Sequence, residues 1–143
     1  MSTEQYTEHA DMPTTHQRRS HRQWWVVVTT LLAAALFSEA IFAGAMLSGV
    51  AWGRTAHHAT AVAVLAAAWP AGLVAIFTLR AVPRGRPLGL GLLALAVVAS
   101  LQTSLGALSA HGTNVMWLHV PTGVALVGFA IQAAAGARRL GGD

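Results

Sequence analysis

The chain alternates between long apolar stretches and short polar segments, and this pattern predicts four membrane-spanning helices. The apolar stretches cover about residues 24–50, 57–79, 88–109 and 115–137. Each is long enough to cross a bilayer, which takes ~20 apolar residues in a helix. Residues 1–23 are polar and predict a short disordered tail, and residues 140–143 form a second one. We therefore expect an all-α membrane protein, a four-transmembrane-helix bundle over residues 24–139.

The composition agrees with this pattern and excludes several classes of protein. Of the 143 residues, 55% are hydrophobic and 10% are charged, whereas a soluble domain usually carries about 25% charged residues. The chain has no cysteine, which excludes disulfides, iron–sulfur clusters and thiolate metal ligands. The net charge of +4 does not indicate nucleic-acid binding, because all nine basic residues are arginines in loops and tails, where membrane topology places them.

The distribution of arginines predicts the orientation in the cell membrane. The N-terminal tail has three, the middle loop has three and the C-terminal end has two, whereas the other two loops contain only Arg54. Positively charged segments stay on the cytoplasmic side, so both termini and the middle loop are expected there. Trp24 and Trp25, at the start of the first span, are expected to be interfacial anchors.

A stretch that opens the second span recurs at the start of the fourth. His57–Leu65 and His119–Val127 share His, Thr, Val and Ala in register. Each follows a span with one central polar residue, Glu39 in the first case and Gln102 in the second. The repeat extends through these spans to Gly44-Ala45 and Gly106-Ala107 with one residue skipped. The pattern predicts two similar helical hairpins in a parallel repeat; chance similarity between alanine-rich spans is the alternative.

Glu39 is the residue with the strongest sign of a function. An ionised carboxylate in the middle of a span costs roughly 2.5–3.5 kcal/mol on insertion scales. The other interpretation is a protonated carboxyl group hydrogen-bonded to a neighbouring helix. Gln102 lies at the same depth in the third span, so the two side chains are expected to face each other or to flank a bound planar ligand.

Two histidines at matched depth are candidates for the axial ligands of a haem. Neutral imidazole binds haem iron, and two histidines on facing helices of a bundle can hold the macrocycle. We predict His57 and His119 as the metal ligands, with His58 competing for the first place. The small residues Ala61 and Gly123, one turn deeper on the same faces, are expected to leave room for a porphyrin edge. The alternative is that these histidines are interfacial residues wetted by headgroups.

Two further residues lie in the loops on the predicted outer side of the membrane, near the candidate histidines. His111 is expected to be a loop residue after the third span, and Arg54 lies in the loop before His57. Either could contact the propionates of a bound haem. The predicted cofactor-binding set therefore comprises His57, His58, His119, Glu39 and Gln102.

The polar residue, the Leu-Gly pair and the histidine that opens the next span resemble one half of the haem A synthase family. The matching residues are Gln102, Leu105-Gly106 and Leu118-His119, and more loosely Glu39 to Gly44 with His57-His58. That family folds as two four-helix bundles, each with a pair of histidines placed for haem. The resemblance implies the bundle and b-type haem binding. It does not carry over the hydroxylating activity, because this chain has one bundle. Small four-helix bacterial membrane proteins are also similar in this pattern.

Three functions follow from these patterns. The first is a haem b-binding membrane bundle, acting in electron transfer or haem handling with a membrane redox or haem-biogenesis partner. The second is a cofactor-free assembly or scaffold protein, and the third is a proton or small-solute pathway using Glu39. No Ser-His-Asp arrangement, paired carboxylates, phosphate loop or zinc motif occurs in the sequence, so an enzyme is the less favoured interpretation. Lipid is the expected surrounding, and self-association of the chain is left open.

Overall fold

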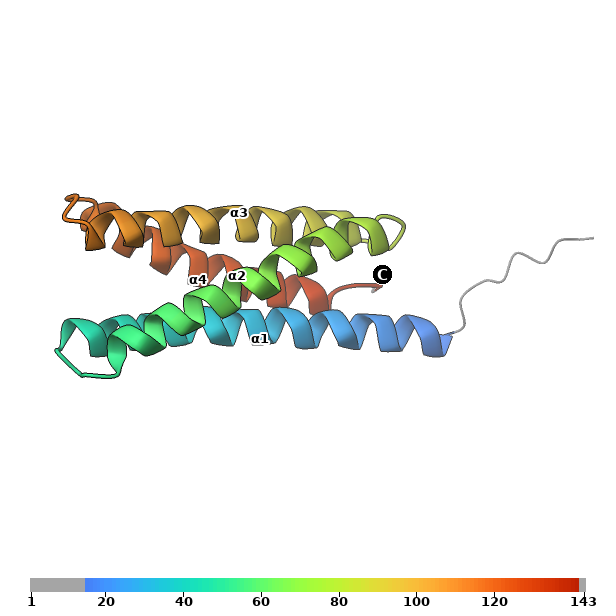
Figure 1. The fold of residues 1–143 in the computed structure, drawn as a ribbon. Coiled ribbons are helices and arrows are strands. Elements are labelled where there is room, and N and C mark those ends of the chain that lie inside the picture. The colour runs from blue at the N-terminus through green and yellow to red at the C-terminus, as the bar shows by residue number, and fades with distance from the viewer. Residues whose placement is uncertain (1–14, 142–143) are drawn as a thin grey trace, which may run out of the picture.

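The protein folds into four long helices joined by short connections (Figure 1). The computed structural model describes residues 15–141. Its helices are α1 (Thr15–Leu47), α2 (Gly53–Thr78), α3 (Gly85–Ala110) and α4 (Met116–Arg138). All four are long and apolar enough to cross a bilayer. The prediction of an all-α chain with four apolar helices is therefore confirmed, and the structure is consistent with a multi-pass membrane protein.

The first helix begins earlier than the apolar pattern predicts. It starts at Thr15, inside the segment 1–23 that we expected to be a tail. No proline or glycine occurs between residues 14 and 43, so nothing in the backbone forces a break where the polar residues end. The apolar span within this helix runs over Ser20–Leu47. The rest of the predicted tail, residues 1–14, lies outside the described residues, as do residues 142 and 143.

Helices α1 and α3 end in the same way, with a glycine in the left-handed conformation. Gly49 has φ 77° and Gly112 has φ 87°, values that are accessible to glycine without a steric penalty. After Gly49, the N–H of Val50 donates to the carbonyl of Ala45 at 3.0 Å, and after Gly112 that of Thr113 donates to Leu108 at 3.0 Å. Both are Schellman caps, which satisfy carbonyl groups at a helix C-terminus.

The four helices form a closed ring of neighbours. Helix α1 packs against α2 and α4, and α3 packs against α2 and α4. Helices α1 and α3 are therefore diagonal to each other, as are α2 and α4. The start of α1, the α2–α3 turn and the end of α4 lie together at one end of the bundle, which we call the terminal end (Figure 1). The α1–α2 and α3–α4 connections lie at the opposite end, which we call the loop end.

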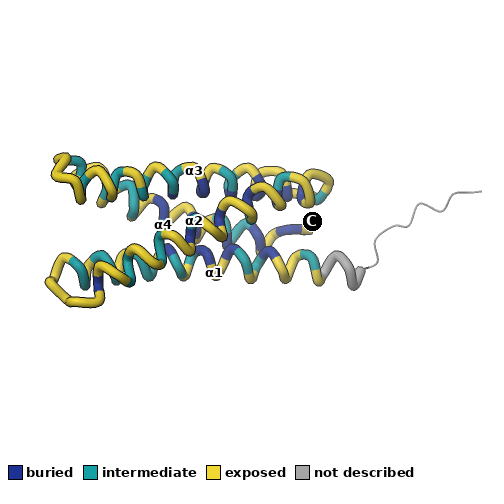
Figure 2. The backbone as a smooth tube through the Cα atoms, in the orientation of Figure 1, coloured by how far each residue is buried: buried dark blue, intermediate teal, exposed yellow. Residues whose placement is uncertain are grey.

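The apolar core is concentrated in the half of the bundle near the terminal end (Figure 2). Buried side chains there come from all four helices and include Leu32, Ala75, Leu92, Leu95 and Ala137. In the half near the loop end, residues 37–52, 54–63 and 100–125 contain no buried position. The loop half is thus the less tightly packed part of the described chain.

Close contact between the two hairpins is made by glycines of the terminal half. A Cβ atom added at Gly72 would lie 2.9 Å from the Cα of Leu93, and one added at Gly89 would lie 3.1 Å from the carbonyl carbon of Ala75. Helices α2 and α3 therefore touch through their backbones in this half. Such close approach through small residues is common between membrane helices.

Close contact near the loop end is made within each hairpin instead. A Cβ atom at Gly53 of α2 would lie 2.5 Å from the backbone nitrogen of Met46 in α1, and one at Gly106 of α3 would meet the His119 ring of α4. Figure 1 shows the same arrangement, with α1 beside α2 and α3 beside α4 at the loop end. The two hairpins thus diverge toward the loop end.

The structure corrects one expectation about the first helix. Trp24 is 60% exposed, as expected of an interfacial anchor, but Trp25 is only 1% exposed and belongs to the core. Adjacent residues on a helix point about 100° apart, because one turn takes 3.6 residues. Trp25 therefore faces the other helices, and it stabilises the terminal half by packing.

Candidate functional site

The candidate site lies in the loop half of the bundle and receives one polar side chain from each helix. Glu39 comes from α1, His57 from α2, Gln102 from α3 and His119 from α4. All four are half-buried, in the region that lacks buried apolar side chains. The residues that we predicted from the sequence are therefore brought to one level of the bundle.

In the first hairpin, Glu39 contacts His57. Oε2 of the carboxyl group lies 2.6 Å from Nδ1 of the imidazole, and the two side chains are 15% and 22% exposed. The two groups are in close polar contact, although the N–H direction is not aligned for a regular hydrogen bond. Oε1 of Glu39 is buried and has no hydrogen-bond partner among residues 15–141.

In the second hairpin, Gln102 and His119 are joined by two hydrogen bonds. The side-chain amide Nε2 of Gln102 donates to the backbone carbonyl of His119 at 2.7 Å. The Nδ1 atom of the His119 ring lies 3.1 Å from the backbone carbonyl of Gln102. Oε1 of Gln102 is buried and, within the described chain, unpartnered. Each candidate histidine is thus held by the polar residue of the preceding helix.

The contacts determine which ring nitrogen of His119 is available to a ligand. A carbonyl oxygen can only accept a hydrogen bond, so Nδ1 must carry the proton. In the neutral ring, the lone pair is then on Nε2, which is the atom that can bind a metal. His57 is likewise contacted at Nδ1. Both rings therefore have the arrangement in which one nitrogen is held by the protein and the other remains for a metal.

Two glycines of the second hairpin allow these contacts. A Cβ atom at Gly106 would lie 3.1 Å from Cε1 of His119, and one at Gly123 would lie 2.8 Å from Nε2 of Gln102. We expected the small residue at position 123 to leave room for a porphyrin edge. The structure corrects this, because the Gln102 amide occupies that space. Gly123 exposes the His119 carbonyl to this amide.

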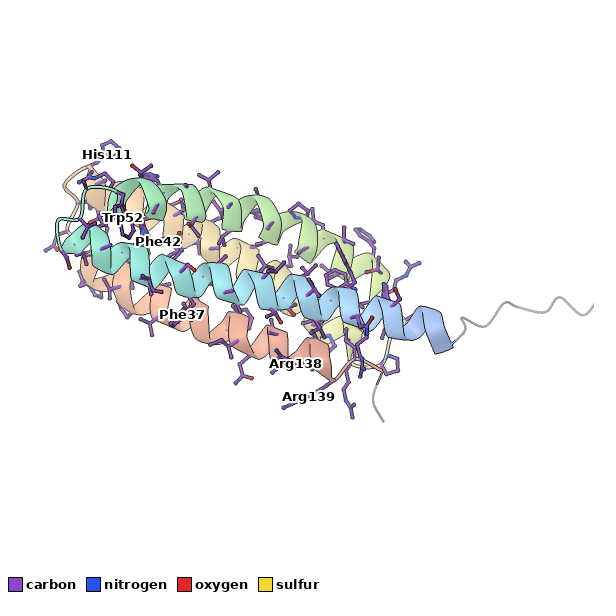
Figure 3. The ribbon with its side chains drawn as sticks, turned by 90° about the horizontal axis from the view of Figure 1, so that it is seen from below. Phe37, Phe42, Trp52, His111, Arg138 and Arg139 are labelled. Carbon is purple, nitrogen blue, oxygen red and sulfur yellow. The ribbon has the colours of Figure 1, made fainter. Side chains whose placement is uncertain are left out.

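The structure distinguishes His57 from the other histidines near the loop end. His57 is half-buried and contacts Glu39, whereas His58 and His111 are exposed. Figure 3 places His111 at the loop end, away from the helix packing. The ring of Trp52 packs edge-on against Phe42 at this end, with centroids 6.1 Å apart. Of the histidines near the loop end, His57 and His119 are thus the two that face the bundle.

The four polar residues form two separate pairs, one in each hairpin, and not a single cluster of ligands. Glu39 and Gln102 lie on diagonal helices, and each contacts the histidine of its own hairpin. Among residues 15–141, no group of three or more His, Cys, Asp or Glu side chains is placed to hold a metal ion.

Aligning Gly44-Ala45 with Gly106-Ala107 placed the one-residue difference between the two hairpins within the first and third spans. The structure places it elsewhere. The structure shows equal spacing from Glu39 to Gly49 and from Gln102 to Gly112, and equally long connections at 48–52 and 111–115. The difference therefore falls in the first turn of α2 and α4, just before the histidines. The glycines that end α1 and α3 were the signal that could have located it.

Comparison of the chain with models of known protein families, with curated proteins and with solved structures finds no match.

Proposed function

We propose that this chain is a multi-pass protein of the cell membrane that binds one haem b between His57 and His119. The observation that carries the proposal is the contact of both imidazole rings through Nδ1, by Glu39 in one hairpin and by the Gln102 backbone in the other. Metal-ligating histidines usually have their second nitrogen held in this way. The resemblance of the residues around Gln102 and His119 to one half of haem A synthase points to the same cofactor.

The open packing of the loop half supports a flat ligand between the hairpins. No side chain is buried in residues 37–52, 54–63 and 100–125, which surround the four polar side chains, and the two hairpins diverge there. Glu39 Oε1 and Gln102 Oε1 are buried acceptors without a partner in the described chain, and such groups usually indicate an additional bonding partner. Haem, when bound, supplies a one-electron couple. Glu39 and Gln102 would orient the rings, and the apolar core would exclude water from one side.

The proposed physiological role is electron transfer or haem handling, with a membrane redox or haem-biogenesis protein as partner. If His57 and His119 both hold the haem iron, the bound haem would supply one-electron chemistry, which favours electron transfer over reactions that require an open ligand position. The proposed orientation has both termini in the cytoplasm, because the loop end carries only Arg54 among the arginines of the described helices and loops.

Absorption spectroscopy of the full chain tests the haem proposal. The protein is expressed with haem supplied, purified in mild detergent and scanned for a Soret band. We expect a spectrum of two-histidine, low-spin haem, which is lost in His57→Ala and in His119→Ala. The matched controls are His58→Ala and His111→Ala, whose exposed rings should not be needed. Circular dichroism checks that each variant retains its helices.

Two results would contradict this proposal. The first is wild-type protein that folds but gives no Soret band when haem is supplied. The second is haem loss in the His58 or His111 variant together with retention in the His57 and His119 variants. Either result would leave the loop half without a haem site of the proposed geometry.

A second function is favoured by a specific observation, namely that the polar contacts already join the helices within each hairpin. Polar side chains that bond across membrane helices stabilise their association, and Glu39–His57 and Gln102–His119 both do so. A cofactor-free scaffold would use these contacts only for stability. In that case, the His57→Ala and His119→Ala variants would unfold more easily and the wild type would bind no haem.

A further inference from the structure

A shallow, open hollow lies on the face of α2 near the loop end. Its lining consists of Arg54, Thr55, His58, Ala59 and Val62. These positions recur about every turn, so they form one stripe along the helix. The stripe is separate from the candidate haem site, because His57 faces Glu39 while His58 is exposed.

The positive charge of Arg54 has no counter-ion within the described chain. Glu39 is the only acidic residue between positions 15 and 141, and its carboxyl group contacts His57. Arg54 is exposed and lies at the end of the bundle where the described helices and loops carry no other arginine. An anion for this guanidinium must therefore come from outside residues 15–141.

The polarity of the hollow changes along the helix. The first part offers hydrogen-bond donors, from the Arg54 guanidinium, the Thr55 hydroxyl and the His58 ring. The part deeper in the span is apolar, with Ala59 and with Val62, whose side chain is 62% exposed. A membrane lipid has the same order of groups, with a phosphate at the surface and an alkyl chain toward the middle of the bilayer.

The corresponding face of α4 provides an internal comparison. The positions at the same distances from His119 as the five lining residues are from His57 are Met116, Trp117, Val120, Pro121 and Val124. None of these carries a charge. The positive charge of the α2 stripe is thus absent from α4, although both helices occupy similar places in their hairpins.

We propose that the α2 stripe binds an anionic phospholipid of the leaflet at the loop end. The Arg54 guanidinium contacts the phosphate, with Thr55 and His58 as further donors, and an acyl chain lies along Ala59 and Val62. An anionic headgroup is favoured over a zwitterionic one, because no free carboxylate of the described chain is available to pair with a headgroup cation. The proposal is independent of haem binding.

Fluorescence quenching by brominated lipids tests this site on the full chain, which has no native cysteine. A fluorophore is attached in the variant Ala66→Cys, one turn below Val62 on the same face. The matched control is Gly128→Cys, the corresponding exposed position of α4, where an added Cβ meets no atom within 4 Å. The vesicles contain phosphatidylcholine with a minor fraction of phosphatidylglycerol, and only one of the two lipids is brominated in each experiment.

We expect phosphatidylglycerol to be enriched about fivefold beside the Ala66→Cys label relative to the Gly128→Cys label, which corresponds to ~1 kcal/mol for one basic residue at an anionic surface. Arg54→Gln should remove the enrichment, and His58→Gln should reduce it. Part of the enrichment should persist in ~1 M salt, where the Debye length is only ~3 Å, because direct contacts are screened less than diffuse attraction.

Three outcomes would overturn the proposal. Equal quenching at the two label positions would show that α2 does not select the anionic lipid. Enrichment that survives Arg54→Gln would show that this guanidinium is not the anion ligand. Loss of the enrichment when haem is added to the labelled Ala66→Cys protein would show that Arg54 serves a haem carboxylate instead of a lipid phosphate.

Discussion

The Nδ1 atom of His119 lies 3.1 Å from the backbone carbonyl of Gln102, so this ring is held by the main chain of the neighbouring helix. The ring of His57 is held instead by a side chain, the carboxyl group of Glu39 at 2.6 Å. Side-chain substitutions can therefore release one histidine and leave the other in place. Substituting Glu39 should therefore affect the His57 ring, whereas substituting Gln102 should leave the His119 ring in place.

Replacing Glu39 with Gln should loosen the first hairpin. The variant replaces the carboxyl group that lies 2.6 Å from His57 with an amide, and losing one partner of a partly buried polar contact costs about 1–3 kcal/mol. Because both side chains are partly exposed, we expect the free energy of unfolding in detergent to fall by about 1–2 kcal/mol. Denaturant titration followed by circular dichroism measures this change.

The matched control for Glu39→Gln is Ser38→Ala in the same helix. The Ser38 hydroxyl donates only to Ala34 of its own helix, at 2.9 Å, so its removal should change stability by less than ~0.5 kcal/mol. If Glu39→Gln proves as stable as the wild type while folding normally, the carboxyl group does not stabilise His57.

Replacing Gln102 with Met should weaken the second hairpin without freeing the His119 ring. Methionine keeps a similar shape but removes the donor to the His119 carbonyl, and one such hydrogen bond contributes about 1 kcal/mol. The ring contact to the Gln102 backbone is unaffected by the side chain. We therefore expect the free energy of unfolding to fall by ~1 kcal/mol, and we expect the NMR chemical shifts of the His119 ring to stay unchanged.

The control is Gln132→Met, at an exposed position of α4, which should leave stability unchanged. A displaced His119 resonance in Gln102→Met would contradict the assignment of the ring to the backbone carbonyl. Equal losses in the two variants would mean that the Gln102 amide makes no specific contact.

Replacing Gly72 with Ala should separate the two hairpins in the terminal half. The added Cβ would lie 2.9 Å from the Leu93 backbone, which cannot move without shifting α3, and overpacking of this kind costs about 1–3 kcal/mol. Gly44→Ala is the matched control, since its Cβ meets no atom within 4 Å and alanine favours a helix. Unfolding curves of the two variants test this contrast, and a Gly72→Ala variant as stable as Gly44→Ala would contradict the packing of α2 on α3.

The sequence was sufficient to predict the four helices and the level of the bundle at which four polar residues of the candidate site lie. Long apolar stretches have few alternatives to a spanning helix, and the matched depths of Glu39, His57, Gln102 and His119 follow from counting residues along such helices. Helix rotation was not predictable in the same way. Trp24 and Trp25 have the same side chain, and only packing reveals that one is exposed and the other buried.

Contacts that involve the backbone were also beyond the reach of the sequence. The partner of the His119 ring is a carbonyl group, which every residue possesses, so no residue type indicates it. The place of Gly123 beneath the Gln102 amide depends on the separation of α3 and α4. The expectation of a porphyrin edge at that position was wrong for this reason.

The proposed orientation predicts which connections can be labelled from outside the cell. Since the chain has no native cysteine, single cysteines can be introduced in Thr113→Cys, in the exposed α3–α4 connection, and in Ala81→Cys, in the exposed α2–α3 turn. A maleimide that does not cross membranes should label the first variant in intact cells. It should label the second only after permeabilisation, because the arginines beside that turn favour the cytoplasmic side. Labelling in the reverse order would place the histidines at the cytoplasmic face and would move the proposed lipid site to the inner leaflet.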